Sequence, residues 1–226
     1  MKNIVVLTGA GISQESGLGT FRDSNGLWEQ HKIEDVATPE AFKRDPDLVL
    51  NFYNLRRRQL IKSLPNEAHY SLNKLHHKYN SFIITQNVDD LHERSGSDDV
   101  LHLHGKLRES RSTIDNKIYP IIGSDLNIGD FCNKGGQLRP NIVWFGEEVP
   151  NMDLAIERVK CADILIIIGT SLNVYPAASL IHYASHAERI INIDPNSLDY
   201  EGVEIIRDKA TIAVPLLVRE LLHNIR

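Results

Sequence analysis

The sequence has little cysteine: only Cys132 and Cys161 occur among its 226 residues. Two thiols cannot build the disulfide framework of a small secreted domain, so we expect a reducing compartment and a cytoplasmic location. No apolar run reaches the roughly 20 residues that cross a membrane. The chain enters its first strand directly, and we therefore expect neither a signal peptide nor a membrane partner.

Basic charge is also scarce. The net charge is −5, and the only cationic cluster is Arg56, Arg57 and Arg58, which excludes an extended nucleic-acid surface. Apolar residues make up 42% and charged residues 24%, as in ordinary globular proteins. The length suits one large domain, alone or with a smaller lobe. We expect a monomer.

A stretch between residues 4 and 22, IVVLTGAGISQESGLGTFR, organises the chain. Its apolar run from Ile4 to Leu7 predicts a buried parallel strand. Gly9, Gly11 and Gly17 follow, and a strand that runs into a glycine turn and a helix can hold a phosphate. The spacing is not G-x-G-x-x-G. A strand-end turn that binds nothing is an equally open alternative.

Strands and helices alternate along the rest of the chain. Apolar patterns predict strands at 81–85, 100–103, 141–145, 163–168 and 189–193, and helices at 47–62, 66–77, 153–161, 177–187 and 210–222. This alternation predicts an α/β fold, a Rossmann-like doubly wound parallel sheet. Residues 23–62 and 106–139 break the alternation and would form a smaller inserted lobe. The Rossmann-like part would then comprise about 1–22, 63–105 and 140–226 of a single domain.

Polar or glycine-containing loops follow four of the predicted strands, at 9–13, 86–89, 104–105 and 169–171. The carboxyl ends of parallel strands meet at one edge of a sheet, and open α/β sheets bind ligands there. These four loops predict a binding crevice.

Two histidines in this crevice share one face of a strand, because His102 and His104 are two residues apart. Either could be a general base near neutral pH, or could simply be bonded to a backbone carbonyl. The pattern does not choose between them. Asn87 and Asp89 could bond a ribose or a carboxamide, or could cap a helix beginning at Leu91.

Tyr53 and Arg56 lie three residues apart on a predicted helix and therefore share a face. An arginine fork and a tyrosine hydroxyl match a carboxylate. A solvated helix face is the alternative. Arg57 points away from Tyr53 on a helix, so we expect its replacement to be silent.

Six motifs together resemble one family. GAGISQESG with TFR, TQNVDDLHERSG, LHLHG, RPNIVWFGE, GTSLNVYPAA and INIDP occur in this order over nearly the whole chain, and their combination is similar to the sirtuins. The resemblance implies an NAD-dependent protein lysine deacylase, acting as a deacetylase, a desuccinylase or a demalonylase. Its substrates would be acylated-lysine proteins or peptides, and its products nicotinamide and O-acyl-ADP-ribose.

The resemblance also implies residue roles. His104, directly before Gly105, would be the general base, and Asn87 would assist catalysis. NAD would be bound by Gly9, Ala10, Gly11, Ile12, Ser13, Glu15, Ser16, Gly17, Thr20, Phe21, Arg22, Gln86, Asn87, Asp89, Gly169, Thr170, Ser171, Asn192, Ile193 and Ala210. The substrate peptide would pair as an added strand with Val143, Trp144, Phe145, Gly146 and Glu147.

The sequence departs from the family at two places. Tyr53 and Arg56 match the Y-x-x-R pair of class III sirtuins, which implies a pocket for succinyl or malonyl groups. Asp23 and Ser24 stand, however, where that class carries a small alanine.

The second departure concerns a structural zinc. Its first cysteine pair falls on Ser112 and Asp115, and its second falls near Phe131 and Lys134, with Cys132 out of step. One misplaced cysteine cannot supply four ligands, so we expect no structural zinc.

Two rival functions stay open. An NAD hydrolase or ADP-ribosyltransferase on the same fold would not need an acyl peptide to release nicotinamide. A non-catalytic NAD-binding sensor would turn nothing over, and His104 would be dispensable.

Overall fold

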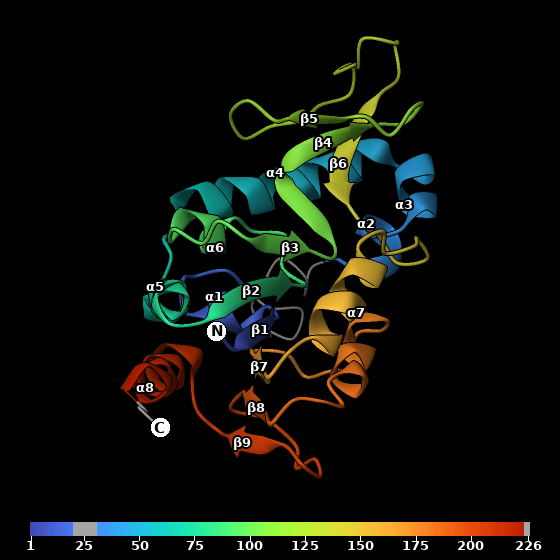
Figure 1. Ribbon diagram of the computed structural model, residues 1–226. Helices are drawn as coiled ribbons and strands as arrows, with labels where there is room; N and C mark the ends of the chain where they lie inside the picture. Colours follow the sequence, from blue (N-terminus) through green and yellow to red (C-terminus); the bar gives the residue numbers. More distant parts are fainter. Residues whose placement is uncertain (20–30, 224–226) are drawn as a thin grey trace.

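Six parallel strands form the main sheet of the computed structural model, which describes residues 1–19 and 31–223 (Figure 1). They lie in the order β3-β2-β1-β7-β8-β9. Their bounds are β1 Asn3–Thr8, β2 Asn80–Thr85, β3 Val100–His102, β7 Ile164–Ile168, β8 Arg189–Ile193 and β9 Glu204–Ile206. The chain order reverses between β1 and β7, and such a switch point is where doubly wound sheets bind ligands. The predicted Rossmann-like sheet is confirmed.

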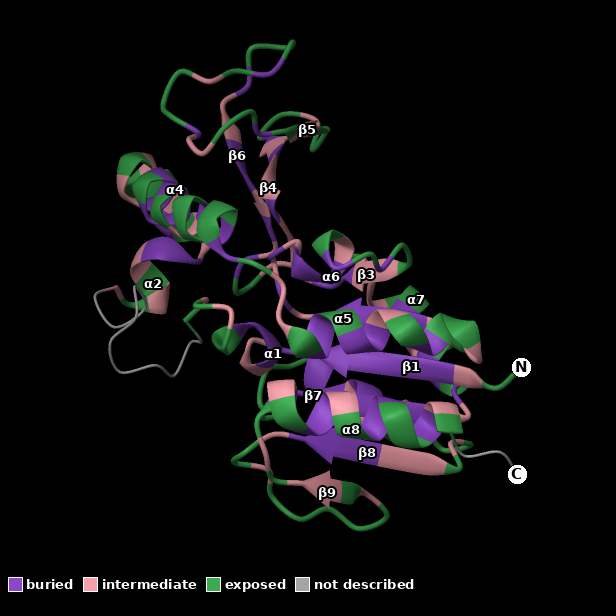
Figure 2. Ribbon diagram, turned by 90° about the vertical axis from the view of Figure 1, so that its left-hand side faces the viewer, coloured by how far each residue is buried: buried purple, intermediate pink, exposed green. Residues whose placement is uncertain are grey.

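Helices cover both faces of this sheet, and the ribbon in Figure 2 shows β1 and β7 coloured mostly as buried. On one face lie α5 (Glu67–Asn73), the 3₁₀ helix η1 (Lys74–His77) and α8 (Ala210–His223). On the other face lie α7 (Met152–Lys160) and the 3₁₀ helix η2 (Ala177–Tyr183). Ile4 and Val6 of β1 point to the first face, and Val5 and Leu7 to the second. A strand covered on both faces must be apolar at every position, which is why β1 and β7 read as continuous apolar runs.

A smaller lobe carries a three-stranded antiparallel sheet in the order β5-β4-β6. Its strands are β4 (Gly105–Ser112), β5 (Ile118–Pro120) and β6 (Leu138–Ile142), and its helices are α2 (Ile33–Val36), α3 (Pro39–Arg44) and α4 (Pro46–Lys62). The side chain of Thr38 caps α3 by accepting from Ala41 N, and that of Asp45 caps α4 by accepting from Leu48 N. The predicted helix at 47–62 and the smaller lobe are confirmed.

Two expectations about elements are wrong, and one strand was missed. The strand predicted at 141–145 to rejoin the main sheet is wrong, because β6 ends at Ile142 and pairs antiparallel with β4. An apolar run does not reveal which sheet will take it. The helix predicted at 177–187 is the shorter 3₁₀ helix η2. Strand β9 was not predicted, since three residues at a sheet edge leave almost no pattern.

The residues expected at the zinc positions are bonded to one another. Ser112 Oγ donates to Cys132 Sγ over 3.2 Å, and Gly136 N donates to the same sulfur over 3.3 Å. Lys134 Nζ pairs with Asp115 Oδ2 at 3.0 Å. An ammonium has no lone pair for a metal, and a phenyl ring at Phe131 offers none either. This donor set does not fit a structural zinc.

Two buried histidines pack beneath the end of β1. The rings of His69 and His92 lie 4.9 Å apart between centroids, and His92 Nε2 is 3.0 Å from Thr8 Oγ1. Burial lowers the pKa of His69 from 6.5 to about 4 and that of His92 well below its usual range. Both rings are therefore neutral in the folded protein at neutral pH.

The buried His69 makes folding sensitive to acid. Between its unfolded pKa of 6.5 and its folded pKa of about 4, the unfolded chain binds the extra proton, so stability falls as pH falls. The His69→Gln variant should lose roughly 2 kcal/mol less unfolding free energy than the parent between pH 7 and pH 5. Urea unfolding at both pH values measures this. The exposed His77→Gln variant is the control, and equal pH slopes for His69→Gln and the parent would contradict the assignment.

Candidate functional site

The loops after β1 and β7 touch through their backbones at the switch point. Gly11 N donates to Gly169 O over 2.8 Å, and Gly9 N donates to Ile168 O over 2.9 Å. Gly169 has φ +62°, and a Cβ built on it would lie 2.4 Å from Ile12 N. A Cβ on Gly9 would lie 2.7 Å from Gly169 O. These glycines are required by the contact between the two loops, whether or not a ligand is bound.

The loop after β2 joins this pair through side chains. Asn87 Nδ2 donates to Gly9 O over 3.1 Å, and Ser13 Oγ donates to Asp89 Oδ2 over 3.0 Å. Gln86 Nε2 donates to Thr170 Oγ1 over 3.1 Å. Burial raises the pKa of the Asp89 carboxyl. Three of the four predicted loops therefore meet at the strand ends.

Asp89 also bonds to the helix that begins at Leu91. Its Oδ1 accepts from Leu91 N over 3.1 Å at the start of α6 (Leu91–Arg94). The two carboxylate oxygens thus have separate tasks, one toward the helix and one toward Ser13 in the β1 loop. The N-cap position itself is Asp90, whose side chain makes no cap bond, so Asp89 bonds the first helical N–H from one residue before the cap and also meets Ser13.

His104 lies at the fourth loop with its ring orientation fixed. Its Nδ1 is 2.9 Å from the carbonyl oxygen of Gln86. A carbonyl only accepts, so Nδ1 carries the hydrogen and Nε2 is the basic nitrogen. Burial lowers the pKa of His104, and the Gln86 bond offsets part of that shift. A neutral ring with a defined tautomer is what a general base requires.

His102 has a different environment. It is 5% exposed, with Nδ1 2.9 Å from Asn87 O and Nε2 2.9 Å from Glu93 Oε1. Both ring nitrogens are engaged inside the protein, so His102 fits the alternative of a histidine that is hydrogen-bonded internally and does not act as a base. The geometry separates the two histidines that the sequence pattern could not.

At the far side of the switch point, β8 supplies a buried amide. Asn192 is 2% exposed, and its Oδ1 finds no hydrogen-bond partner among the residues that the structure describes. Ile193 O accepts from Gly169 N over 2.9 Å, which ties this strand end to the β7 loop. Ala210 begins α8 on the adjoining face. An orphaned amide oxygen beside glycine loops fits a nucleotide ribose, so the residues fit NAD.

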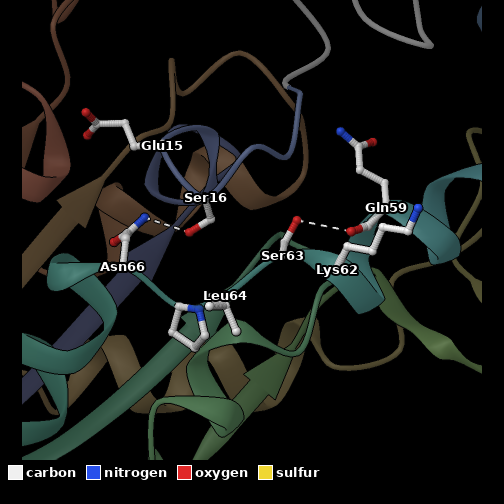
Figure 3. A pocket seen from close by; sticks show the side chains of 8 residues that line it. Glu15, Ser16, Gln59, Lys62, Ser63, Leu64 and Asn66 are labelled. Atoms are coloured by element: carbon white, nitrogen blue, oxygen red, sulfur yellow. Dashed lines mark hydrogen bonds between the residues drawn. The ribbon is translucent and has the colours of Figure 1, made fainter.

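Two residues expected to bind NAD bond elsewhere. Thr211 donates to Glu15 Oε2 from both its backbone N and its Oγ1, and Asn66 Nδ2 donates to Ser16 Oγ over 3.0 Å. Glu15 and Ser16 line a cavity of about 450 Å³ together with the end of α4 and the segment 63–66 that leads to α5 (Figure 3). Their assignment to NAD stays a prediction. Thr20, Phe21, Arg22, Asp23 and Ser24 lie outside the described residues.

Tyr53 is not on a solvated helix face. It is 1% exposed, and its hydroxyl accepts from Trp144 Nε1 over 2.9 Å. Burial raises the pKa of Tyr53 to about 12. Arg56 is half-buried, with its guanidinium 5.8 Å from the centroid of the Phe52 ring, and burial lowers its pKa. The charges of Tyr53 and Asp89 oppose part of that lowering of the Arg56 pKa.

Replacement of Arg57 was expected to be silent because the residue points away from Tyr53 on the helix, but the structure buries it, which contradicts that expectation. It is 0% exposed, and its guanidinium donates to Leu107 O, Asn54 Oδ1 and Ser124 O. These bonds join α4 to the small sheet and the segment that follows it. An arginine in a basic triplet looks solvated in sequence, and only the packing of α4 reveals that its middle member is buried.

Residues 143–147 form a turn, not a strand. Val143 N donates to His104 O over 3.0 Å, and Phe145 N donates to Ala37 O over 3.0 Å. The Glu147 carboxylate accepts from Trp144 N, Arg111 and Arg139. Phe145 is 44% exposed. The segment is therefore hydrogen-bonded directly to the His104 backbone. Its pairing with a peptide stays a prediction.

Comparison with known proteins decides the family. The model of the Sir2 family matches residues 9–176, which include all four strand-end loops. The chain belongs to the Sir2 family.

Curated relatives are similar to this chain over nearly its whole length. An NAD-dependent protein deacylase of Helicobacter pylori is 51% identical over 99% of this chain and 97% of its own, and one of Bacteroides thetaiotaomicron is 48% identical over 98% and 99%. Among solved structures, a Sir2 homologue in complex with NAD has a TM-score of 0.89 at 41% identity, covering 98% of this chain and 90% of its own. A Sir2 complex with a p53 peptide and NAD has a TM-score of 0.80 at 30% identity, covering 96% and 92%.

The contact between the two loops predicts that Gly169→Ala strongly lowers both folding stability and ADP-ribose binding. The new Cβ must clash with Ile12 N at a left-handed φ, so the loops should separate. We expect a lower unfolding temperature and at least tenfold weaker binding of ADP-ribose by calorimetry. A loss of about 1.4 kcal/mol of binding free energy is enough for a tenfold weaker affinity. Gly202→Ala is the matched control: its φ is +73°, but its Cβ would meet nothing within 4 Å, and the residue has no assigned role in binding. Equal effects of the two variants would contradict the loop-contact account.

Proposed function

We propose that this chain is an NAD-dependent protein lysine deacylase that releases nicotinamide and O-acyl-ADP-ribose. The observation that carries the proposal is the geometry of His104, a neutral imidazole whose basic nitrogen is set by the Gln86 carbonyl. The names of the near relatives and the NAD-bound neighbour support the same activity.

NAD would lie across the strand ends. The loops 9–13 and 169–171 would hold its phosphates and adenosine half, with Asn192 at the adenosine ribose. Gln86, Asn87 and Asp89 would line the nicotinamide ribose. Bound NAD supplies the ribose carbon that takes the acyl oxygen as nicotinamide leaves.

The chain's own groups position the reactants and move one proton. His104 would accept a proton at Nε2 from the ribose hydroxyls, because Nδ1–H is held by Gln86. The bonds among Asn87, Gly9 and Ser13 fix the loops before reaction, so little motion is needed at the moment of transfer.

The acyl peptide would dock along residues 143–147. This turn bonds to the backbone of His104 itself and presents Phe145 to solvent. The peptide bound to a Sir2 neighbour supports a protein or peptide substrate. Tyr53 and Arg56 would meet an acidic acyl group at the far end of the lysine.

We also propose that the enzyme works as a monomer in the cytoplasm. The thiols of Cys132 and Cys161 are both free, as a reducing compartment requires. Separately, among residues 1–19 and 31–223 no helix is long and apolar enough to cross a bilayer.

Replacing His104 separates catalysis from binding. His104→Ala should slow deacylation roughly 10²- to 10⁴-fold while NAD affinity stays near the parent value, since a general base adds rate but little ground-state binding. Exchange of labelled nicotinamide should survive, because it precedes the step that needs the base. Steady-state kinetics and calorimetry measure these effects. Deacylation at the parent rate would show that His104 is not the base.

The acyl pocket is tested at Arg56. Arg56→Met should lower kcat/KM for succinyl-lysine by roughly ten- to a hundredfold, since a charge-assisted hydrogen bond is worth about 1.5–3 kcal/mol. Acetyl-lysine has no carboxylate and should lose far less. Arg58→Met is the control, because Arg58 is exposed and pairs only with Asp125 in the described contacts. Arg57 cannot serve as a control, because it is buried. Equal responses of both substrates to Arg56→Met would reject the pocket.

We propose that the small lobe folds without zinc. The Ser112–Cys132 bond and the Asp115–Lys134 pair join residues 112–115 to residues 132–134, the two stretches that a zinc ion would otherwise cross-link. Purified protein should contain no stoichiometric zinc by elemental analysis, and a chelator should leave its unfolding temperature unchanged. One zinc per chain would overturn this and require ligands among other residues.

A further inference from the structure

The Tyr53 hydroxyl receives a hydrogen bond from a group that can only donate. Trp144 Nε1 lies 2.9 Å from Tyr53 Oη. An indole nitrogen carries one hydrogen and accepts nothing, so the tyrosine oxygen is the acceptor. The single hydrogen of the hydroxyl must then point away from the indole. Within residues 1–19 and 31–223, no hydrogen bond donated by this hydroxyl is seen.

The indole ring of Trp144 is held in one orientation. The guanidinium of Arg139 lies over the ring, 3.3 Å from its centroid. Nη1 and Nη2 of Arg139 donate to the two carboxylate oxygens of Glu147 over 2.7 and 3.0 Å. The same carboxylate accepts from Trp144 N over 2.8 Å. Because its backbone and its ring face are both fixed, the 2% exposed Trp144 keeps its N–H directed at Tyr53.

Tyr53 belongs to a core that two parts of the site share. Its ring lies in one buried cluster with Trp144 and Leu91, and Val88 of the loop 86–89 packs against that cluster. The charge of Arg56, one helical turn further along α4, acts on the Tyr53 hydroxyl. The hydroxyl is therefore placed beside a cation, in a core that joins the turn 143–147 to the loop 86–89.

We propose that Trp144 is a positioning residue for acyl recognition: its indole N–H holds the Tyr53 oxygen as an acceptor and thereby directs the hydroxyl hydrogen to the carboxylate of an acidic acyl group. The inference rests on the proposed function, because the acyl pocket at Tyr53 and Arg56 is assigned there. The side chain of Trp144 itself touches no substrate in this account.

The chain of donors gives the pocket a direction. A carboxylate only accepts, so it needs a tyrosine that donates, and a tyrosine that already accepts from Trp144 is set to do so. Hydrogen bonds in such a chain polarise and strengthen one another. The methyl group of acetyl-lysine accepts no hydrogen bond and gains nothing from this arrangement. Trp144 should therefore act on the choice between acyl groups, and it connects that choice to the turn on which the peptide would dock.

The indole N–H signal of Trp144 reports the chain of bonds without any turnover. The protein has two tryptophans, and the Trp144→Phe variant identifies the signal of Trp144 in a ¹⁵N spectrum. The signal should move in Tyr53→Phe, and a saturating succinyl-lysine peptide should move it further than an acetyl-lysine peptide of the same sequence. Equal displacement by the two peptides, or no displacement by either, would overturn the proposal. A selective displacement without deacylation would uphold it and reject the proposed reaction instead.

A double-mutant cycle tests whether Trp144 acts through Tyr53. Trp144→Phe keeps an aromatic ring beneath Arg139 and removes only the N–H. The ratio of kcat/KM for succinyl-lysine to that for acetyl-lysine should fall roughly threefold to tenfold, as for one ordinary hydrogen bond, and the loss should lie mainly in KM. In the Tyr53→Phe background the same change should lower the ratio no further.

The matched control is Tyr79→Phe. It removes a tyrosine hydroxyl that donates to Leu221 O over 2.8 Å in α8, so it costs a comparable hydrogen bond outside the site and should leave the ratio at the parent value. An unchanged ratio in a folded Trp144→Phe protein would overturn the positioning role. An equal further fall in the Tyr53→Phe background would overturn it as well, because Trp144 would then act by another route.

Discussion

Two loops at the ends of β1 and β7 share one backbone contact, in which Gly11 donates to Gly169 and neither position tolerates a Cβ. The strand order makes this contact possible, because β1 and β7 are neighbours at the switch point. The loop after β2 then reaches across with Asn87 and Gln86, and Ile193 at the end of β8 accepts from Gly169. A site for a long nucleotide thus follows from a few close approaches between otherwise ordinary strand ends.

The polar groups at these ends are held mostly by backbone carbonyls. His104 and His102 bond consecutive carbonyls of one loop, and residues 143–147 bond back to His104. The turn 143–147, His104 and the proposed nicotinamide side of the site are therefore one connected unit. Below it, the neutral pair His69 and His92 supports Thr8 at the end of β1.

Much of this could be predicted from sequence, and the misses have physical reasons. Buried strands leave apolar runs and caps leave Thr38 and Asp45, so the sheet and most helices were predictable. The partner of a strand is not encoded in its own pattern, which is why 141–145 was placed in the wrong sheet. Neighbours distant in sequence decide burial of charge, so Arg57 looked solvated. The choice between His102 and His104 needed hydrogen-bond partners from two other elements. Glu15 and Ser16 were assigned by resemblance, and their side chains bond to Thr211 and Asn66.

The family and the geometry together make one reaction the central claim: nicotinamide is released only when an acylated lysine is present. The most direct measurement is nicotinamide release from NAD with acetyl-lysine, succinyl-lysine and unmodified lysine peptides of the same sequence. The account predicts release with one or both acylated peptides, in equal amount to the free lysine formed, and none above background with the unmodified peptide. Equal release with all three peptides would contradict it and make the protein an NAD hydrolase.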